Sequence, residues 1–322
     1  MTNLFPFLEP LIELQNKISE LEGMSQTTGL DMSKEVALLR SKWESESRRI
    51  FDGLTPWQRV QLSRHPARPQ TSDYIDHMLT DWVPLAGDRM FGDDGAIICG
   101  MGRLLDRPVV LVGQEKGKDL NSRRRCNFGM PHPEGYRKAM HKMRLAERFN
   151  LPVVCLVNTP GAFPGIEAEE RGQSIAIAEN IRDMAALRTP VVVVVIGEGG
   201  SGGALGIGIG DRMLMPENSY FSVISPEGCA AILWKDGNKR DVAAERLGLT
   251  GPILKKHGIV DEVIPEPAGG GHCQPQALVH RVRDAIDRHL GELCAMTEDQ
   301  RMDKRYAKLR AIGQVVEAAA AG

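Results

Sequence analysis

A run of β-branched residues that leads directly into glycines is the strongest constraint on the fold of this chain. Five valines and an isoleucine occupy residues 191–196, and the chain continues as Gly197-Glu-Gly-Gly-Ser-Gly-Gly203. A continuous β-branched run of this length is typical of a strand buried on both faces of a sheet. Glycines allow a sharp turn and a close approach to backbone N–H groups. Because N–H groups at a helix N-terminus favour negative charge, the segment predicts an anion-binding turn.

Four interpretations of this turn compete. Gly197-x-Gly199-x-x-Gly202 matches a dinucleotide fingerprint. Gly199-x-Ser201-x-Gly203 matches a nucleophile elbow with Ser201 at its tip. In the third interpretation the amides of Gly202 and Gly203 form an oxyanion hole, which holds an oxygen that gains charge during a reaction. In the fourth, the glycines only allow tight packing between helix and sheet.

Composition places few limits on function. The 322 residues are 42% hydrophobic and 25% charged, as in an ordinary globular protein, and the net charge of −2 gives no drive toward nucleic acid or a membrane surface. No apolar run approaches the roughly 20 residues of a spanning helix, and the N-terminus does not resemble a signal peptide. We therefore expect a cytoplasmic protein without a membrane partner.

The cysteines and histidines do not predict a metal site. Six cysteines are widely scattered without a Cys-x-x-Cys pair, and the eight histidines show no ligand-like spacing. A zinc ribbon in this chain is therefore disfavoured.

The pattern along the chain predicts three parts: an N-terminal helical arm over residues 1–85, a core over residues 86–295 and a C-terminal helical tail over residues 296–322. In the arm, apolar residues such as Leu11, Leu14 and Ile18 recur at helical spacing. The core alternates strands with helices, which predicts an α/β fold with a largely parallel sheet.

Two glycine-rich loops follow consecutive predicted strands of the core. They are Thr159-Pro-Gly-Ala-Phe-Pro-Gly165 and the segment 197–203. Ligands of such folds collect at the carboxyl ends of strands, so the two loops predict a pocket lined by backbone. The candidate substrate-binding residues in these loops are Gly161, Ala162, Phe163, Pro164, Gly165, Gly199, Gly200 and Ser201.

A basic segment precedes the helix expected from Pro133. It contains Lys116, Lys118 and three consecutive arginines, of which Arg124 and Arg125 are candidate ligands for phosphate or carboxylate groups. A solvated surface loop explains the charge equally well, although the adjoining Asn127-Phe-Gly-Met-Pro131 disfavours that explanation.

Context weakens two of the four interpretations. A dinucleotide fingerprint belongs to the opening strand–helix unit and needs an acidic residue about 20 positions later, whereas Asp211 and Glu217 come too soon. A serine nucleophile needs a base and an orienting acid. The order serine, acid, histidine can be filled from the following residues: Asp211, Glu217, Asp236, His257, His272 and His280. A serine hydrolase that uses Ser201 therefore stays as the alternative.

Several long blocks resemble a known family. They span most of the chain in order: Arg64-His-Pro-Ala-Arg-Pro69, Leu85-Ala-Gly-Asp-Arg89, Asn127-Phe-Gly-Met-Pro131, Pro133-Glu-Gly-Tyr-Arg-Lys-Ala139, Thr159-Pro-Gly-Ala-Phe-Pro-Gly165, Ala168-Glu-Glu-Arg-Gly-Gln-Ser174, Ile196-Gly-Glu-Gly-Gly-Ser-Gly-Gly-Ala204, Val223-Ile-Ser-Pro-Glu-Gly-Cys229 and Ile264-Pro-Glu-Pro267. With these blocks the chain resembles the alpha subunits of bacterial-type acetyl-coenzyme A carboxylase carboxyltransferase.

The resemblance implies a crotonase/ClpP-like spiral of stacked strand–strand–helix turns. It implies a carboxyl transfer from carboxybiotin, presented by the biotin carboxyl carrier protein, to acetyl-CoA, which gives malonyl-CoA for fatty acid biosynthesis. The implied partners are a beta subunit with a zinc ribbon, in an α2β2 heterotetramer, together with the carrier protein and biotin carboxylase. No cofactor is then held covalently by this chain.

In this family, the glycines that match Gly202 and Gly203 are assigned to the oxyanion hole for the biotin oxygen. The chain departs from the family at Asn158, where aspartate is usual, and at Cys126, which follows the arginines. It also has Gln114-Glu-Lys-Gly117 where His-Gln-Lys-Gly is more usual.

Overall fold

A mixed eight-stranded sheet forms the centre of the computed structural model, which describes residues 5–313. Its path is β1-β2-β3-β4-β5-β6-β8, and β7 pairs with β5 beside this path. Pairs β1–β2 and β2–β3 are antiparallel, whereas the pairs from β3 onward are parallel. The strands are β1 (Leu79–Pro84), β2 (Ile97–Leu104), β3 (Arg107–Gln114), β4 (Val153–Thr159), β5 (Val191–Gly200), β6 (Arg212–Pro216), β7 (Tyr220–Ser222) and β8 (Glu262–Ile264).

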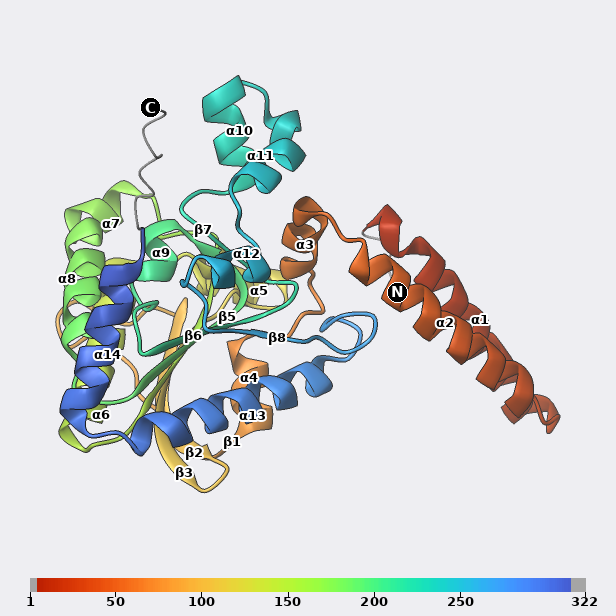
Figure 1. The fold of residues 1–322 in the computed structure, drawn as a ribbon, viewed down its shortest axis with the longest axis horizontal. Coiled ribbons are helices and arrows are strands. Elements are labelled where there is room, and N and C mark those ends of the chain that lie inside the picture. The colour runs from red at the N-terminus through yellow and green to blue at the C-terminus, as the bar shows by residue number, and fades with distance from the viewer. Residues whose placement is uncertain (1–4, 314–322) are drawn as a thin grey trace, which may run out of the picture.

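Helices enclose this sheet and extend beyond it (Figure 1). They are η1 (Pro6–Leu8), α1 (Glu9–Thr28), α2 (Ser33–Asp52), α3 (Pro56–Ser63), α4 (Thr71–Met78), α5 (Leu120–Arg125), η2 (Asn127–Gly129), α6 (Pro133–Arg148), α7 (Ile166–Glu170), α8 (Gln173–Ala186), α9 (Ser201–Leu205), α10 (Pro226–Trp234), η3 (Gly237–Lys239), α11 (Arg240–Arg246), α12 (Gly251–Lys256), α13 (Pro275–Cys294) and α14 (Glu298–Ala311).

The valine strand β5 is buried on both faces, as its composition predicts. Side chains alternate across a strand, so Val191, Val193 and Val195 enter the core beneath α6 and α8. The intervening side chains, among them Val192 and Val194, enter the opposite core beneath α4 and α13. Both layers are apolar along residues 191–196, and this part of the strand therefore lies in the middle of the molecule.

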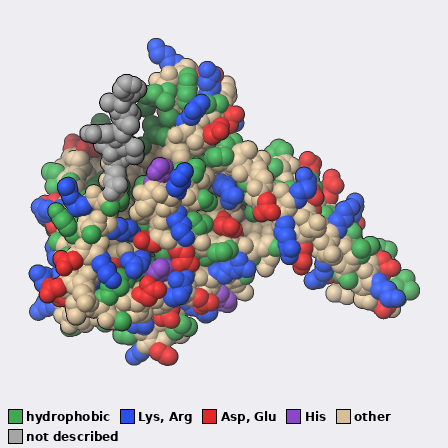
Figure 2. All heavy atoms as spheres, in the orientation of Figure 1, with side chains coloured by type: hydrophobic (Ala, Val, Ile, Leu, Met, Phe, Trp, Pro, Cys, Tyr) green, Lys and Arg blue, Asp and Glu red, His purple; other side chains and the backbone are tan. Residues whose placement is uncertain are grey.

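Two parts of the chain project from this body (Figures 1 and 2). One is the antiparallel pair α1–α2, which packs through Leu11, Leu14 and Ile18. The hydroxyl of Ser47 in this pair accepts a hydrogen bond of 2.7 Å from the Gly269 amide and so connects the arm to the core. The other projecting part consists of α10 and α11.

The sequence-based boundaries hold in part. Within the predicted core, β2 and β3 form an antiparallel hairpin in which Leu104 pairs with Arg107. Residues 79–84 lie within the predicted helical arm but form strand β1, because Leu79 pairs with Leu104 at the edge of the sheet. The predicted C-terminal helix is α14, whereas residues 314–322 of the predicted tail lie outside the described residues. The three-part division itself stays a prediction.

The glycines after the valine run do not form the loop that the sequence predicts. Strand β5 continues through Gly200, and its last residues pair with β7 in the register Glu198↔Tyr220 and Gly200↔Ser222. The chain turns only at Ser201, where α9 begins. Across the described part of the chain, no helix is long and apolar enough to cross a membrane.

Candidate functional site

The junction between β5 and α9 is a sharp turn with two uncapped amides. Ser201 has a φ of 54°, in the left-handed region that residues other than glycine seldom adopt. Gly200 precedes the helix and provides no side chain to cap it. Within residues 5–313, the N–H groups of Gly202 and Gly203 have no backbone acceptor. Both donors therefore lack a backbone partner, and Gly202 is the more accessible of the two residues.

The two predicted loops lie directly against each other. A Cβ atom on Gly203 would lie 2.5 Å from the Ala162 nitrogen, and one on Gly200 would lie 2.5 Å from the Pro160 carbonyl carbon. These positions have no space for a side chain, so the close contact of the two loops requires glycine at both. Gly202 differs, because a Cβ there would meet only Ile177, at 3.7 Å. There is therefore space for another atom beside the Cα of Gly202 but not beside that of Gly203.

A third loop completes this edge of the sheet. The Phe163 amide donates a hydrogen bond of 3.0 Å to the Pro131 carbonyl. The Gln173 side-chain amide donates to the carbonyls of Pro131 and Phe163, at 2.8 and 2.9 Å. The ring of His132 stacks on Phe163 with centroids 4.1 Å apart. The Asn127-Phe-Gly-Met-Pro131 segment thus supports the 159–165 loop.

Two buried amide side chains hold the turn from below. Gln114 donates a 2.8 Å hydrogen bond to the Gly203 carbonyl and accepts one of 2.9 Å from the Asn158 backbone. Asn158 accepts from the Glu198 backbone and donates to Gln70, at 3.2 and 3.1 Å. An aspartate could not donate to Gln70, so the amide at position 158 fits its neighbours. The sequence did not indicate these positioning roles, although both residues stand at strand ends.

The predicted binding residues differ in accessibility. Gly199 and Gly200 are buried within β5, where their backbone pairs with β7. Gly203 is also buried, whereas Gly202 is half-buried and Ser201 is exposed. In the other loop Pro164 is exposed, and the remaining candidates are half-buried: Gly161, Ala162, Phe163 and Gly165.

The basic segment forms the short helix α5 beside the third loop. Arg124 and Arg125 are exposed, and neither forms an ion pair with any residue in the described range. The next residue, Cys126, is buried, and burial raises the pKa of its thiol to about 11. The two arginines can therefore meet an anion, whereas the thiol stays protonated at neutral pH.

The catalytic triad that a serine hydrolase needs is not assembled. Within the part of the chain that the structure covers, no hydrogen bond joins Ser201 to a histidine. Asp211 pairs with Arg305 at 2.7 Å, and the Glu217 carboxylate accepts from the Glu266 amide. His272 lies against His65 with ring centroids 4.2 Å apart.

The remaining acid and histidines that could complete a triad have other partners or are exposed on other helices. Asp236 accepts a hydrogen bond of 3.0 Å from the backbone amide of Asn238, two residues later in the chain. His257 and His280 are exposed, on α12's C-terminal end and on α13.

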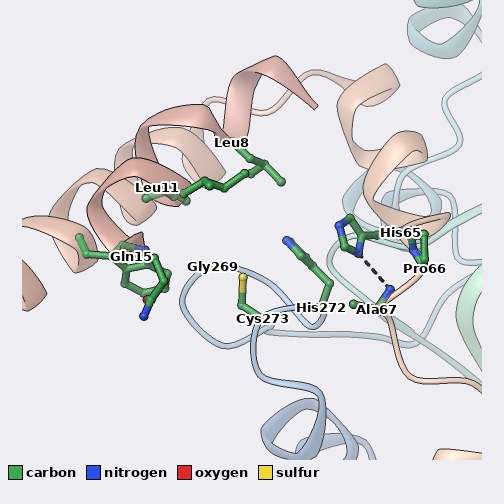
Figure 3. A pocket seen from close by; sticks show the side chains of 11 residues that line it. Leu8, Leu11, Gln15, His65, Pro66, Ala67, Gly269, His272 and Cys273 are labelled. Atoms are coloured by element: carbon green, nitrogen blue, oxygen red, sulfur yellow. Dashed lines mark hydrogen bonds between the residues drawn. The ribbon is translucent and has the colours of Figure 1, made fainter. Parts of the chain in front are cut away.

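His272 instead lines a cavity between the arm and the core (Figure 3). The cavity has a volume of about 260 Å³ and is mainly apolar, with Leu8, Leu11 and Trp43 on the arm side. None of the predicted substrate-binding residues lines it, and neither Gly202 nor Gly203 does. Over residues 5–313 no group of three or more histidine, cysteine or acidic side chains is arranged to bind a metal ion.

Solved structures with a similar arrangement of strands and helices identify the fold. Transcarboxylase 12S matches 82% of this chain with a TM-score of 0.56 and 18% identity. The beta subunit of geranyl-CoA carboxylase from P. aeruginosa matches 79% with a TM-score of 0.54 and 19% identity. The chain spans about half the length of each of these two chains, at 47% and 46%. The fold is therefore the crotonase-like fold of carboxyltransferases, as predicted.

Sequence comparison identifies the family within this class. Residues 4–313 match the sequence model of the family described as acetyl co-enzyme A carboxylase carboxyltransferase-like. The acetyl-coenzyme A carboxylase carboxyl transferase subunit alpha of Syntrophotalea carbinolica is 52% identical over 97% of this chain and 98% of its own length. Its counterpart from Oceanobacillus iheyensis is 47% identical over 97% and 99%.

The chain belongs to this family of carboxyltransferase alpha subunits. The predicted family and carboxyl-transferring function are confirmed, and the serine hydrolase alternative is not supported.

Proposed function

We propose that this chain transfers a carboxyl group from carboxybiotin to acetyl-CoA, and that the amides of Gly202 and Gly203 are its main catalytic groups. The observation that carries the proposal is the pair of uncapped N–H groups at the Ser201 turn, with open space beside Gly202. Carboxybiotin, presented by the biotin carboxyl carrier protein, supplies the carboxyl group, and malonyl-CoA is the product.

The chemistry needs donors more than it needs an acid or a base. Loss of the carboxyl group places negative charge on the ureido oxygen of biotin, and fixed N–H groups stabilise such charge as it develops. Removal of one donor of this kind typically costs about 100- to 1000-fold in turnover. A backbone site also agrees with the unassembled triad around Ser201.

The surrounding loops would hold the rest of the substrates. The half-exposed 159–165 loop lies against the turn, and its backbone atoms at Gly161 and Ala162 form the contact. Arg124 and Arg125 are exposed beside the third loop, and guanidinium groups bind phosphates well. We assign these two arginines to the phosphates of the coenzyme A moiety.

A beta subunit with a zinc ribbon is the proposed partner, in an α2β2 heterotetramer that also works with the carrier protein and biotin carboxylase. Exposed apolar side chains near and on α10 support an interface: Val223, Ile232 and Leu233 are 77%, 71% and 65% exposed. Figure 2 shows hydrophobic side chains gathered over this projecting part. The cytoplasmic location that the sequence predicts stays a prediction.

Co-expression with a beta subunit of this family tests the proposal. The purified pair should form malonyl-CoA from acetyl-CoA and a carboxybiotin donor, and each subunit alone should be inactive or nearly so. The control is the same pair with acetyl-CoA but with biotin that carries no carboxyl group. If the pair forms a stable complex that transfers no carboxyl group, the proposal is wrong.

A further inference from the structure

Glu198 is the one large side chain in a stretch that otherwise lacks them. Between residues 197 and 203 the chain carries five glycines, and only Glu198 and Ser201 have side chains. Glycine gives a strand end unusual conformational freedom. The geometry of the turn therefore depends on backbone pairing and on what Glu198 binds. Its carboxyl group is buried, with a residue exposure of 5%.

Three donors from separate parts of the chain meet this carboxylate. One oxygen accepts a hydrogen bond of 2.6 Å from Arg64, which follows α3, and one of 3.0 Å from the Tyr220 hydroxyl in β7. The other oxygen pairs with the Lys116 ammonium, just after β3. The stem of Lys116 lies beneath Gly129 of the third loop, where a Cβ would meet it. Glu198 thus connects β5 to three neighbouring elements at the edge that carries the site.

The same ionic group reaches the projecting helix α10. Arg64 also pairs with Glu227, near the start of α10, at 2.5 Å. Two cations and two carboxylates then balance in charge. Helix α10 carries the exposed apolar residues Ile232 and Leu233. Through Arg64, the ion pairs therefore connect this helix to strand β5, which precedes the turn.

The carboxylate is not arranged to move protons. Burial alone would disfavour its charge, but Lys116 and Arg64 outweigh burial and lower the pKa of Glu198 to about 2. The group therefore stays ionised across the pH range in which an enzyme works. All three donors already occupy it, and its role is to hold its neighbours in place.

We propose that Glu198 is a positioning residue that fixes the Ser201–Gly203 turn in the geometry required for carboxyl transfer, and that Lys116 and Arg64 act through it. This inference rests on the proposed function. It predicts that a change at Glu198 lowers the rate of the chemical step, since a displacement near 1 Å can cost about 100-fold.

The test uses Glu198→Gln in the complex with the beta subunit. The variant keeps the size of the side chain but removes the charge that Lys116 and Arg64 require. We expect kcat per folded complex to fall by at least about tenfold, whereas KM for acetyl-CoA changes by less than about threefold. The ratio of wild-type to variant kcat should be flat between pH 6 and 9.

Asp211→Asn is the matched control. Asp211 is also a buried carboxylate, paired with Arg305 at 2.7 Å, but it binds the amide of Val191 at the opposite end of β5. Its replacement should lower the melting temperature and leave kcat per folded complex unchanged. A loss at Glu198 that matches the control, with activity simply proportional to the folded fraction, would overturn the inference.

A double variant tests whether Lys116 acts through Glu198 or affects kcat independently of it. Lys116→Met removes the same ion pair from the other side, so the losses in kcat of the two single variants should not multiply in the double variant. Multiplicative losses, or a Glu198→Gln complex with wild-type kcat, contradict the inference. If Glu198→Gln does not fold, Lys116→Met alone must still lower kcat rather than raise KM. An inactive wild-type pair would instead refute the proposed function.

Discussion

Replacement of Gly203 by alanine tests the account with the smallest possible change. The new methyl group would lie 2.5 Å from the Ala162 nitrogen, whereas ordinary contacts begin at 3.4 Å. The two loops must therefore separate by at least about 0.9 Å, because the atoms in contact are backbone and leave no flexible side chain to move. A displacement of about 1 Å at a reacting centre costs about 100-fold in rate, which corresponds to about 2.7 kcal/mol. We expect Gly203→Ala to lower kcat of the complex by about this factor.

The neighbouring glycine provides the matched control. At Gly202 the same methyl group would meet only Ile177, at 3.7 Å, which is an ordinary contact. Gly202→Ala should therefore keep the fold and the spacing of the loops, so its melting temperature should fall less than that of Gly203→Ala. A loss of kcat in Gly202→Ala would then come from the methyl group in the open space beside this amide and not from separation of the loops. Steady-state carboxyl transfer, with thermal unfolding as a check on folding, measures both variants. Wild-type kcat in a folded Gly203→Ala complex would refute the argument.

Three further predictions concern side chains. Ser201→Ala should keep the rate of carboxyl transfer within a few-fold of wild type. Loss of turnover would instead support Ser201 as a nucleophile. Arg124→Ala combined with Arg125→Ala should raise KM for acetyl-CoA more strongly than it lowers kcat, and an unchanged KM at low salt would contradict the phosphate assignment. Burial, with help from His65 and the Arg68 cation, lowers the pKa of His272 to about 3, so only the unfolded chain gains its proton as the pH falls below 6.5. Stability should therefore fall by about 1.4 kcal/mol from this group between pH 7.5 and 5.5. When the free energy of unfolding is measured with urea at both pH values, His272→Gln should lose about 1.4 kcal/mol less than the wild type. An equal loss in both proteins would show that His272 is not the group responsible.

The sequence predicts the sheet well because its strongest signals are local. A β-branched run such as residues 191–196 is a buried strand in almost any context, and the alternation of strands and helices restricts the topology. The extension of β5 through Gly200 was not predictable in this way. Its glycines pair with β7, and that register is decided by residues 20 positions away in the chain.

The candidate site shows the same division. The contact between the two glycine-rich loops was predicted, because both follow parallel strands that lie side by side. The supporting contacts were not, since Gln114, Asn158 and Glu198 act through partners that are distant in sequence. No local pattern marks a buried amide that holds a turn, and only the folded chain brings Arg64 to Glu198.

The most direct measurement is a crystal structure of the complex with the beta subunit and a biotin derivative bound. We expect the ureido oxygen to lie about 2.7–3.1 Å from the backbone nitrogens of Gly202 and Gly203. A ureido oxygen bound elsewhere, with these two amides facing solvent or protein, would contradict it.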